Sequence, residues 1–183
     1  MPISFVRSLP QPVPQYRYRL VETAWGLVAF ACCGSVVTRL LLPVSSRSVA
    51  DKAIKRWCPT ARLEEDLLQD LHQQIVAYFA GRSFHFDCQV DLSWAGEFGQ
   101  AVLRCCSRIK PGQTLSYGRL ARLVGNANAA RAVGNIMAAN RVPLIIPCHR
   151  VIGTDGRLGG FSAQGGIRLK KRLLEHESPR HAT

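Results

Sequence analysis

A chain of 183 residues with 47% apolar residues is long enough for one good hydrophobic core or two small ones, which excludes disorder across the whole chain. Its formal charge of +12 is uneven: residues 1–93 hold 10 Lys or Arg against 8 Asp or Glu (10 − 8 = +2), whereas residues 94–183 hold 14 against 4 (14 − 4 = +10). A basic half of this kind attracts polyanions such as nucleic acid, although solubility or a generally basic proteome would give the same charge.

The seven cysteines are an odd number and include two adjacent pairs, Cys32-Cys33 and Cys105-Cys106, which is not the pattern of a secreted disulfide framework. We infer a reducing compartment and expect a cytoplasmic protein, or a nuclear one in a eukaryote. The start lacks the layout of a signal peptide, and the apolar stretch at 26–37 is too short to span a bilayer. Without a CxxC motif or paired histidines no metal or other cofactor is predicted, and a meeting of Cys32, Cys33 and His85 in space is left open.

The N-terminal half predicts a small α+β domain over residues 21–93, preceded by a proline-rich and flexible lead-in at 1–20. Its expected elements are strands at 25–33 and 35–42 joined by a turn at Gly34 and ended by Pro43, helices at about 46–57 and 62–80, and a strand at 84–90. The apolar stripe of the second helix is core packing, so this half offers few chemical features.

The C-terminal half predicts a second domain over residues 94–178, followed by a short tail at 179–183. After a helix at 95–107, short helices at 116–124 and 129–140 are joined by a glycine-containing turn, which is the outline of a helix-turn-helix. The second of these helices carries Arg131 near its start, beside small residues such as Ala130 and Gly134 that allow close approach to another surface. Tight packing in a core would also explain the small residues, but the basic surroundings favour DNA.

The stretch at 142–151 carries the strongest functional signal in the sequence. An apolar run, expected to be a buried strand or a strand-like approach, ends at Pro147 and then presents Cys148 beside His149 and Arg150. An imidazole that accepts the thiol proton and a nearby positive charge both raise the thiolate fraction, and the thiolate is the reactive form of cysteine. On the local pattern alone, a nucleophile and a buried structural cysteine are equally good explanations.

Two features follow the cysteine. A hairpin-like turn at 153–156 leads to a glycine-rich loop at 159–166, which lacks the P-loop pattern and is interpreted as a pocket wall. The last helix, at 167–177, is basic on its exposed face and ends at Glu177, which either orients an imidazole or is a solvated carboxylate.

The Pro-Cys-His-Arg-Val segment at 147–151, the Arg-Ala-Val-Gly-Asn segment at 131–135 and Asn140 together resemble the O6-alkylguanine-DNA alkyltransferases. The resemblance is continuous from about residue 95 to 177 and covers the N-terminal half only in layout. It implies an α+β fold in which a ribonuclease-H-like domain precedes a mostly helical, winged-helix-like (helix-turn-helix) catalytic domain. The zinc ligands that some members carry near the N-terminus are not matched, since neither Cys nor His occurs before Cys32.

The resemblance also implies roles for individual residues. Cys148 would accept the alkyl group, His149 would deprotonate it through a water molecule, Glu177 would orient His149, and Asn140 would brace the turn. Tyr117 would crowd the DNA phosphate, help to rotate the nucleotide and assist the leaving guanine. Arg131 would fill the vacated place in the base stack of a duplex bound by its minor groove. The other candidates for DNA contact are Ala130, Gly134, Arg150 and Ser116, and those for the base pocket are Tyr117, Ser162, Phe161 and Pro143. Relative to the shorter form of this loop, two extra residues follow Ser162. Phe161 stands where many relatives have tyrosine.

The sequence therefore predicts a monomeric DNA repair protein that flips O6-alkylguanine out of duplex DNA and transfers the alkyl group irreversibly to Cys148. Activity on O4-alkylthymine and the range of alkyl sizes stay open. The alternatives are an alkyltransferase-like protein that binds lesions without repair, which Cys148 argues against, and a helix-turn-helix regulator, which needs a specific operator. A Cys-His hydrolase is disfavoured because its histidine is normally remote in sequence.

Overall fold

The computed structural model describes residues 3–6 and 15–178 of the chain. The protein has the expected mixture of α-helices and β-strands, and it divides into two compact units, one through Trp94 and one from Ala95. This boundary lies one residue from the one expected at 93/94. None of the helices in the described ranges is both long enough and apolar enough to cross a membrane.

The N-terminal unit is built on one sheet of six strands in the order β1-β6-β4-β3-β2-β5. Strands β2, β3 and β4 are antiparallel neighbours, whereas β1, β5 and β6 pair in parallel. The elements are β1 (Ser4–Val6), β2 (Tyr16–Thr23), β3 (Gly26–Cys33), β4 (Val36–Val44), α1 (Arg47–Trp57), β5 (Arg62–Leu63), α2 (Gln69–Phe79) and β6 (Gln89–Asp91).

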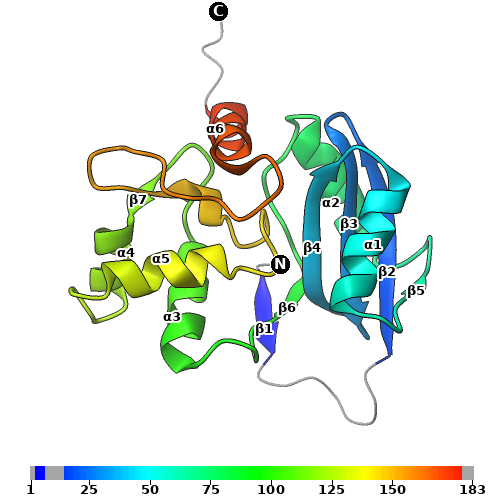
Figure 1. Cartoon of the computed structure of the whole chain (residues 1–183), viewed down its shortest axis with the longest axis horizontal. Coiled ribbons are helices and arrows are strands. Elements are labelled where there is room, and N and C mark those ends of the chain that lie inside the picture. Colours follow the sequence, from blue (N-terminus) through cyan, green and yellow to red (C-terminus); the bar gives the residue numbers. More distant parts are fainter. Residues whose placement is uncertain (1–2, 7–14, 179–183) are drawn as a thin grey trace, which may run out of the picture. The chain divides into compact units, whose positions relative to one another are not determined.

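Alternation along the strands gives this sheet two apolar faces. Tyr18, Ala29 and Ala31 form a buried cluster with Ala50 and Ile54 of α1. The intervening positions, such as Phe30, are also fully buried, and α2 contributes a second row of buried side chains. Figure 1 shows α1 in front of the sheet and α2 behind it. The expected hairpin is confirmed as β3 and β4 around Gly34, whose φ of 59° suits a glycine.

The helix expected from residue 62 is wrong in its first part. Arg62 and Leu63 instead form β5, which pairs in parallel with Arg17 and Tyr18. Leu68 then adopts a left-handed φ of 43°, and α2 begins only at Gln69. A strand of two residues that pairs about 45 positions away in sequence has no periodic pattern of its own. The four-residue spacing of apolar residues therefore predicts a helix that starts too early.

Three further expectations differ in this unit. The lead-in expected at 1–20 includes β1, which pairs with β6, and the start of β2, because the alternating Tyr16, Tyr18 and Leu20 face the buried cluster. Pro43 does not end β4, which runs to Val44. The register between β3 and β4 shifts beside Pro43, and such an irregularity in the pairing tolerates a residue without a backbone N–H. The strand expected at 84–90 is only β6. The prolines of 7–14 and the tail at 179–183 lie outside the described residues.

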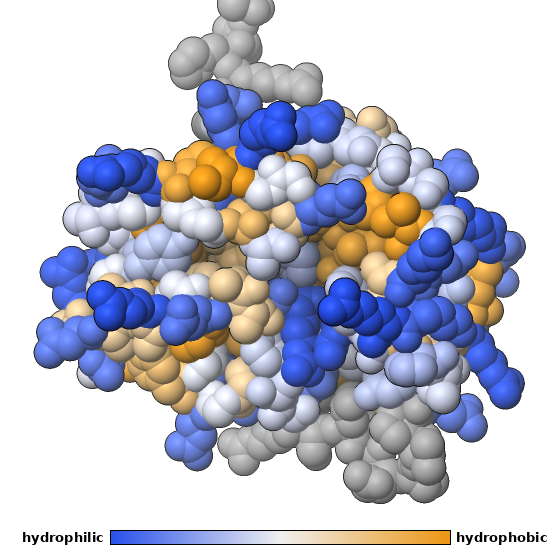
Figure 2. Space-filling view, viewed as in Figure 1, coloured by the Kyte–Doolittle hydropathy of each residue, from blue (hydrophilic) through white to orange (hydrophobic). Residues whose placement is uncertain are grey.

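The C-terminal unit is mostly helical. It contains α3 (Glu97–Cys106), β7 (Leu115–Ser116), α4 (Tyr117–Leu123), α5 (Ala130–Ala138), a 3-10 turn η1 (Cys148–Arg150), β8 (Val151–Ile152) and α6 (Gly166–Glu177). Helices α3, α4 and α5 pack on one another, and the short β7 and β8 pair in parallel. The two short helices and their turn are confirmed, with Gly125 at a φ of 84° after α4. Figure 2 shows that the visible side chains over α6 are mostly hydrophilic, in keeping with its exposed Arg168, Lys171 and Arg172.

Candidate active site

Cys148 begins the 3-10 turn η1, and its side chain is buried with 5% of its surface exposed. The preceding apolar run is not the strand that the sequence predicts. Residues 142–146 form turns, with an Ile146 N–H to Val142 carbonyl bond of 3.0 Å and a left-handed Leu144 at a φ of 72°. A non-glycine residue in that region is strained, so other contacts must hold the turn in place.

Asn140 supplies those contacts. Its Nδ2 donates to the carbonyl of Ile146 at 2.8 Å, and its Oδ1 accepts from the backbone N–H of Val142 at 3.1 Å. The side chain thus ties both ends of the turn that leads to Cys148, as expected for a bracing residue. Asn140 also hydrogen-bonds the thiol of Cys148, which favours the thiolate.

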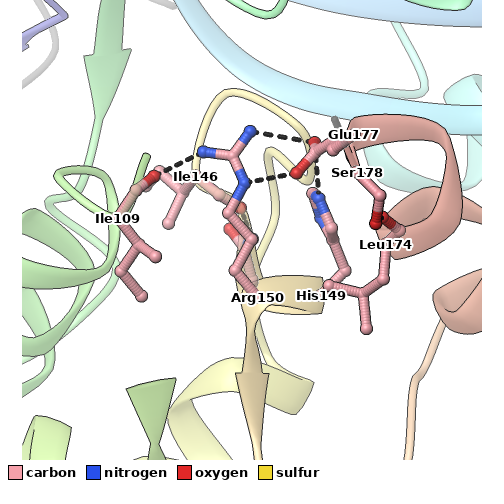
Figure 3. Close-up of polar contacts among 8 residues, drawn as sticks. Ile109, Ile146, His149, Arg150, Leu174, Glu177 and Ser178 are labelled. Carbon is pink, nitrogen blue, oxygen red and sulfur yellow. Dashed lines mark hydrogen bonds and ion pairs between the residues drawn. The ribbon is translucent and has the colours of Figure 1, made fainter. Parts of the chain in front are cut away.

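His149 and Glu177 form the second part of the site. The His149 Nε2 lies 2.8 Å from Glu177 Oε1, and both side chains are almost fully buried (Figure 3). Hydrogen bonds from His149 and Arg150 lower the pKa of Glu177 to about 2 against the cost of its burial, so its carboxylate is ionised and only accepts. Burial lowers the pKa of His149, so its ring is neutral and carries its proton on Nε2.

This tautomer leaves the Nδ1 of His149 as a hydrogen-bond acceptor. Nδ1 is buried, and no hydrogen-bond partner for it is found among the described residues. An unpartnered buried acceptor costs stability, which is a common sign of a functional atom. The arrangement is that of a general base whose orientation is fixed from behind by a carboxylate.

Arg150 does not fit the expected DNA contact. Its guanidinium is buried and donates from Nε to Glu177 Oε2 at 2.7 Å, from Nη2 to Glu177 Oε1 at 2.8 Å, and from Nη1 to the carbonyl of Ile109 (Figure 3). All three of these nitrogens are therefore used inside the protein. Arg150 holds Glu177 in place because arginine matches a carboxylate with two parallel bonds.

Burial raises the pKa of the Cys148 thiol above its ordinary value, and the hydrogen bond of Asn140 and the charge of Lys170 oppose that rise. The resting side chain is therefore a thiol that must lose its proton before it can react. His149, with its unpartnered Nδ1, is the neighbouring group suited to take that proton.

Lys170 was not anticipated from the sequence. Its side chain extends from α6, is only 1% exposed, and donates from Nζ to the carbonyl of Val151 at 2.7 Å and to the Tyr117 hydroxyl at 3.3 Å. Tyr117, the first residue of α4, is half-buried, and burial raises the pKa of its phenol. A Cβ added at Gly159 would lie 2.6 Å from the Tyr117 hydroxyl, so the glycine-rich loop lies directly against this tyrosine.

Helix α5 presents its expected DNA-contact residues in different ways. Arg131 is exposed, Ala130 is the first residue of α5, and a Cβ at Gly134 would be 4.0 Å from the Tyr117 ring. Ser116 has a structural role, because its hydroxyl accepts from the N–H of Arg119 and caps α4. Exposed Arg119 and Arg122 on α4 add positive charge that sequence reasoning did not assign.

Apart from Tyr117 of α4, the expected base-pocket residues belong to two loops of this unit. Pro143 is half-buried in the turn before Cys148, Phe161 is half-buried, and Ser162 is exposed. The loop around the extra residues is held by a bond from the Gly166 N–H to the Ala163 carbonyl, at 2.9 Å.

No group of three or more His, Cys, Asp or Glu side chains that could hold a metal ion occurs in residues 3–6 and 15–178. Cys32 and Cys33 lie buried in β3, and burial raises the pKa of both thiols. Nothing in the structure brings them together with His85 as metal ligands.

Comparison with known proteins places this site in a family. The model of the 6-O-methylguanine DNA methyltransferase DNA-binding domain matches residues 97–179. A methylated-DNA–protein-cysteine methyltransferase of Mycobacterium bovis is 36% identical over 163 residues, which cover 89% of this chain and 93% of that protein. The solved O6-methylguanine methyltransferase of Mycobacterium tuberculosis covers 92% of this chain and 96% of its own, with 34% identity and a TM-score of 0.75. A structure of the tuberculosis protein in complex with DNA has a TM-score of 0.74, with 36% identity over 88% of this chain and 92% of that one. The chain therefore belongs to the methylated-DNA–protein-cysteine methyltransferase family.

Proposed function

We propose that this protein repairs DNA by moving the alkyl group of O6-alkylguanine to Cys148 in a single turnover. The observation that carries the proposal is the buried Cys148 beside His149, whose Nδ1 is unpartnered while its Nε2 is fixed by an ionised Glu177. Its relatives are named for this activity, and one was solved with DNA. No feature of the site favours lesion binding without repair or sequence-specific regulation.

The first step is activation of the thiol. His149 takes the Cys148 proton through a water molecule, because residues adjacent in a 3-10 turn point in different directions. Glu177 stabilises the imidazolium that forms, and Arg150 keeps the carboxylate ionised and in place. This support resembles the orienting carboxylate of hydrolase triads in its logic.

The second step is alkyl transfer. The Sγ–carbon bond forms as the carbon–O6 bond breaks, and the electron pair stays with the guanine. Tyr117 gives or shares its phenolic proton with the departing base, which lowers the energy of the developing anion. The product is a thioether, and no second nucleophile is assigned to regenerate the thiol, so each molecule acts once.

DNA would reach the site through α4 and α5. The exposed Arg119, Arg122 and Arg131 supply positive charge for phosphates, and the small residues of α5 allow close approach to the minor groove. Arg131 would take the place of the extruded nucleotide, and Phe161, Ser162 and Pro143 would line the pocket for the flipped base.

Finer features are part of the same proposal. We assign the N-terminal unit to a ribonuclease-H-like fold and the C-terminal unit to a winged-helix-like one. A domain boundary near 93/94, action as a monomer, and a location in the cytoplasm or nucleus complete it. The supports are the sheet order of the first unit, the paired helices of the second, and a reaction that needs one acceptor per lesion.

The test is intact-mass measurement after incubation with duplex DNA that carries one O6-methylguanine. We expect a stoichiometric gain of one methylene on the wild-type protein, located on the peptide that contains Cys148. Cys148→Ala should gain nothing while still binding the duplex, and Cys105→Ala serves as the matched control because it removes a half-buried thiol elsewhere in the same unit. Transfer by Cys148→Ala would refute the proposal.

A further inference from the structure

The outer edge of β2 in the N-terminal unit is only partly covered. In the order of the sheet β5 is the outer neighbour of β2, and it pairs with β2 only at Arg17 and Tyr18 (Figure 1). One further bond joins the backbone N–H of Glu64 to the Tyr18 carbonyl at 2.9 Å. Beyond that bond, no strand within residues 3–6 and 15–178 pairs with this edge along residues 19–23.

The uncovered stretch directs backbone polar groups away from the sheet. Along a strand, the N–H and C=O groups of successive residues point alternately to one edge and the other. The Tyr18 carbonyl points outward to Glu64, so Leu20 and Glu22 also direct their N–H and C=O groups outward, whereas Val21 faces its partner strand β3. The edge therefore offers two donors and two acceptors in the spacing that an additional strand would match.

A pocket of about 780 Å³ lies along the same edge. Its lining includes Arg19, Leu20, Glu22 and Thr23, which are the side chains of the uncovered stretch apart from Val21. Consecutive side chains of a strand point to opposite faces of the sheet, so this pocket extends around the edge and reaches both faces. A segment that enters the pocket would lie directly beside the outward backbone groups of β2.

The side of the pocket that faces α1 has an apolar floor. Leu20 and Leu27 are partly buried against the cluster under α1, and Leu63 of β5 is 37% exposed beside them. The pocket is also lined by three charged side chains, Glu22, Glu65 and Arg47. With two carboxylates and one guanidinium, this side suits an apolar side chain and does not favour an acidic one.

The side of the pocket that faces α2 holds a buried cation. Arg19 is 8% exposed, and its Nη1 donates to the Leu67 carbonyl at 3.2 Å and to Gln69 Oε1 at 2.6 Å. Both acceptors are uncharged, and no ion pair joins Arg19 to an Asp or Glu within residues 3–6 and 15–178. His72 of α2 lines the same pocket, and its buried Nδ1 has no hydrogen-bond partner in that part of the chain. A guanidinium withdrawn from water is costly without an opposite charge, so this side favours a carboxylate.

We propose that the outer edge of β2 binds an extended peptide segment of another protein as an added strand, with an acidic side chain of the peptide against Arg19 and apolar ones over Leu20 and Leu27. Main-chain hydrogen bonds to Leu20 and Glu22 provide the affinity, and the alternation of acidic and apolar side chains provides the specificity. The inference goes beyond the proposed function, because every residue of this pocket belongs to the N-terminal unit and none takes part in the methyl transfer.

An extended peptide fits this edge better than two other occupants. A small carboxylate or phosphate would pair with Arg19 but leave the outward backbone groups of Leu20 and Glu22 without partners. A second copy of the chain would offer the same short stretch of its own edge, with an arginine where the pocket favours an acid. A stable interface between two copies also buries about 800 Å² on each partner, which a stretch of this length does not supply by itself.

The first experiment uses the isotope-labelled full chain and capped synthetic peptides of about seven residues that alternate valine with glutamate. Matched peptides carry glutamine or lysine in place of glutamate, and glutarate serves as a small carboxylate. Two further peptides carry N-methyl groups, one on the amides that face the protein and the other on the amides that face away. The readouts are the dissociation constant from NMR titration and the hydrogen-exchange rates of the Leu20 and Glu22 amides.

We expect the glutamate peptide to slow exchange of both amides, the glutamine peptide to bind about tenfold more weakly, and the lysine peptide more weakly still. N-methylation of the amides that face away should be tolerated, whereas N-methylation of the opposite set should abolish binding. Unchanged exchange at Leu20 and Glu22 with excess glutamate peptide would overturn the inference. Equal effects of glutarate would replace the peptide by a small anion, and protection that grows with protein concentration alone would replace it by a second copy.

The second experiment tests the charge of Arg19 in the protein. Arg19→Gln should weaken binding of the glutamate peptide about tenfold and leave the glutamine peptide nearly unaffected. Arg17→Gln is the matched control, since Arg17 lies on the same strand, pairs with Glu64 and does not line the pocket. Equal preference for the glutamate peptide in both variants would contradict the role of Arg19. If Arg19→Gln does not fold, the comparison of peptides on the wild-type protein decides the same point.

Discussion

Both units of the protein bury thiols, but the cation beside Cys148 is buried, whereas the cation beside Cys32 is half-exposed. In the N-terminal unit Cys32 lies buried within β3, where burial raises its pKa and the half-exposed Arg17 only partly opposes the rise, and burial raises the pKa of Cys88 to about 12. In the C-terminal unit Cys148 is as well buried, yet Lys170 and a hydrogen bond from Asn140 oppose the effect of burial. Burial thus disfavours the ionised form of each thiol, and at Cys148 a buried cation and a hydrogen bond oppose that effect.

The largest effect that would test this contrast is expected from Glu177→Gln. The neutral amide cannot stabilise the imidazolium that His149 becomes, its NH2 group can donate to Nε2 and favour the other tautomer, and it leaves Arg150 without its anion. Single-turnover methyl transfer should slow by about 1,000-fold, as general-base catalysis typically contributes factors of this size. Glu175→Gln is the control, since Glu175 is an exposed carboxylate on the same helix. Transfer within a factor of two of wild type would show that the buried ions do not activate the thiol.

Arg150→Met tests whether Arg150 stabilises the fold, as its buried bonds to Glu177 indicate, or binds DNA. Removal of one partner of a buried ion pair leaves Glu177 uncompensated, so the free energy of unfolding should fall by about 3 kcal/mol in urea titrations. Arg168→Met, on the exposed face of α6, should change it by less than about 0.5 kcal/mol. The affinity of folded Arg150→Met protein for undamaged duplex should match the wild type. Weaker DNA binding at unchanged stability would restore Arg150 as a DNA contact.

Stability against pH should also report on the buried His149 and Glu177 of the second unit, since the pKa of each is shifted by folding. His149 has a pKa below its ordinary value of 6.5, so the unfolded chain binds the extra proton first and stability is lost as pH falls below that value. The pKa of Glu177 is lowered from 4.5 to about 2, so its contribution is present above 4.5 and is lost between those limits. Urea titrations from pH 8 to pH 3 should show both losses. Stability that stays constant over that range would argue against the charged states assigned here.

The sequence predicts the outline of the site better than its interior. The Cys148-His149 pair, Asn140 and Glu177 were found because the motif and the end of the last helix mark them. Arg150 was assigned to DNA because a charge beside a nucleophile in a basic half suggests phosphate, and only the fold brings the Ile109 carbonyl and Glu177 to it. Lys170 was overlooked among the basic residues of α6, although its spacing of three and seven residues from the buried Leu173 and Glu177 places it on the same inward face. The two-residue strand β5 had no local signal at all.

The smallest effects are expected from alanine substitutions at one glycine of each unit. A Cβ added at Gly159 would lie 2.6 Å from the Tyr117 hydroxyl, so Gly159→Ala must displace the tyrosine or the loop. We expect methyl transfer to slow by about tenfold with little loss of stability, because a small misplacement of a reacting group is enough to reduce the rate. Gly160→Ala is the matched control, since its added Cβ meets nothing within 4 Å.

Gly26 in the N-terminal unit provides the opposite case. It has a φ of 118°, and an added Cβ would lie 2.8 Å from the Val44 carbonyl, so Gly26→Ala should lower the free energy of unfolding while the transfer rate per folded molecule stays unchanged. If Gly159→Ala instead destabilised the fold and left the rate intact, the loop against Tyr117 would be part of the framework. In that case the loop would not be what positions Tyr117 for the reaction.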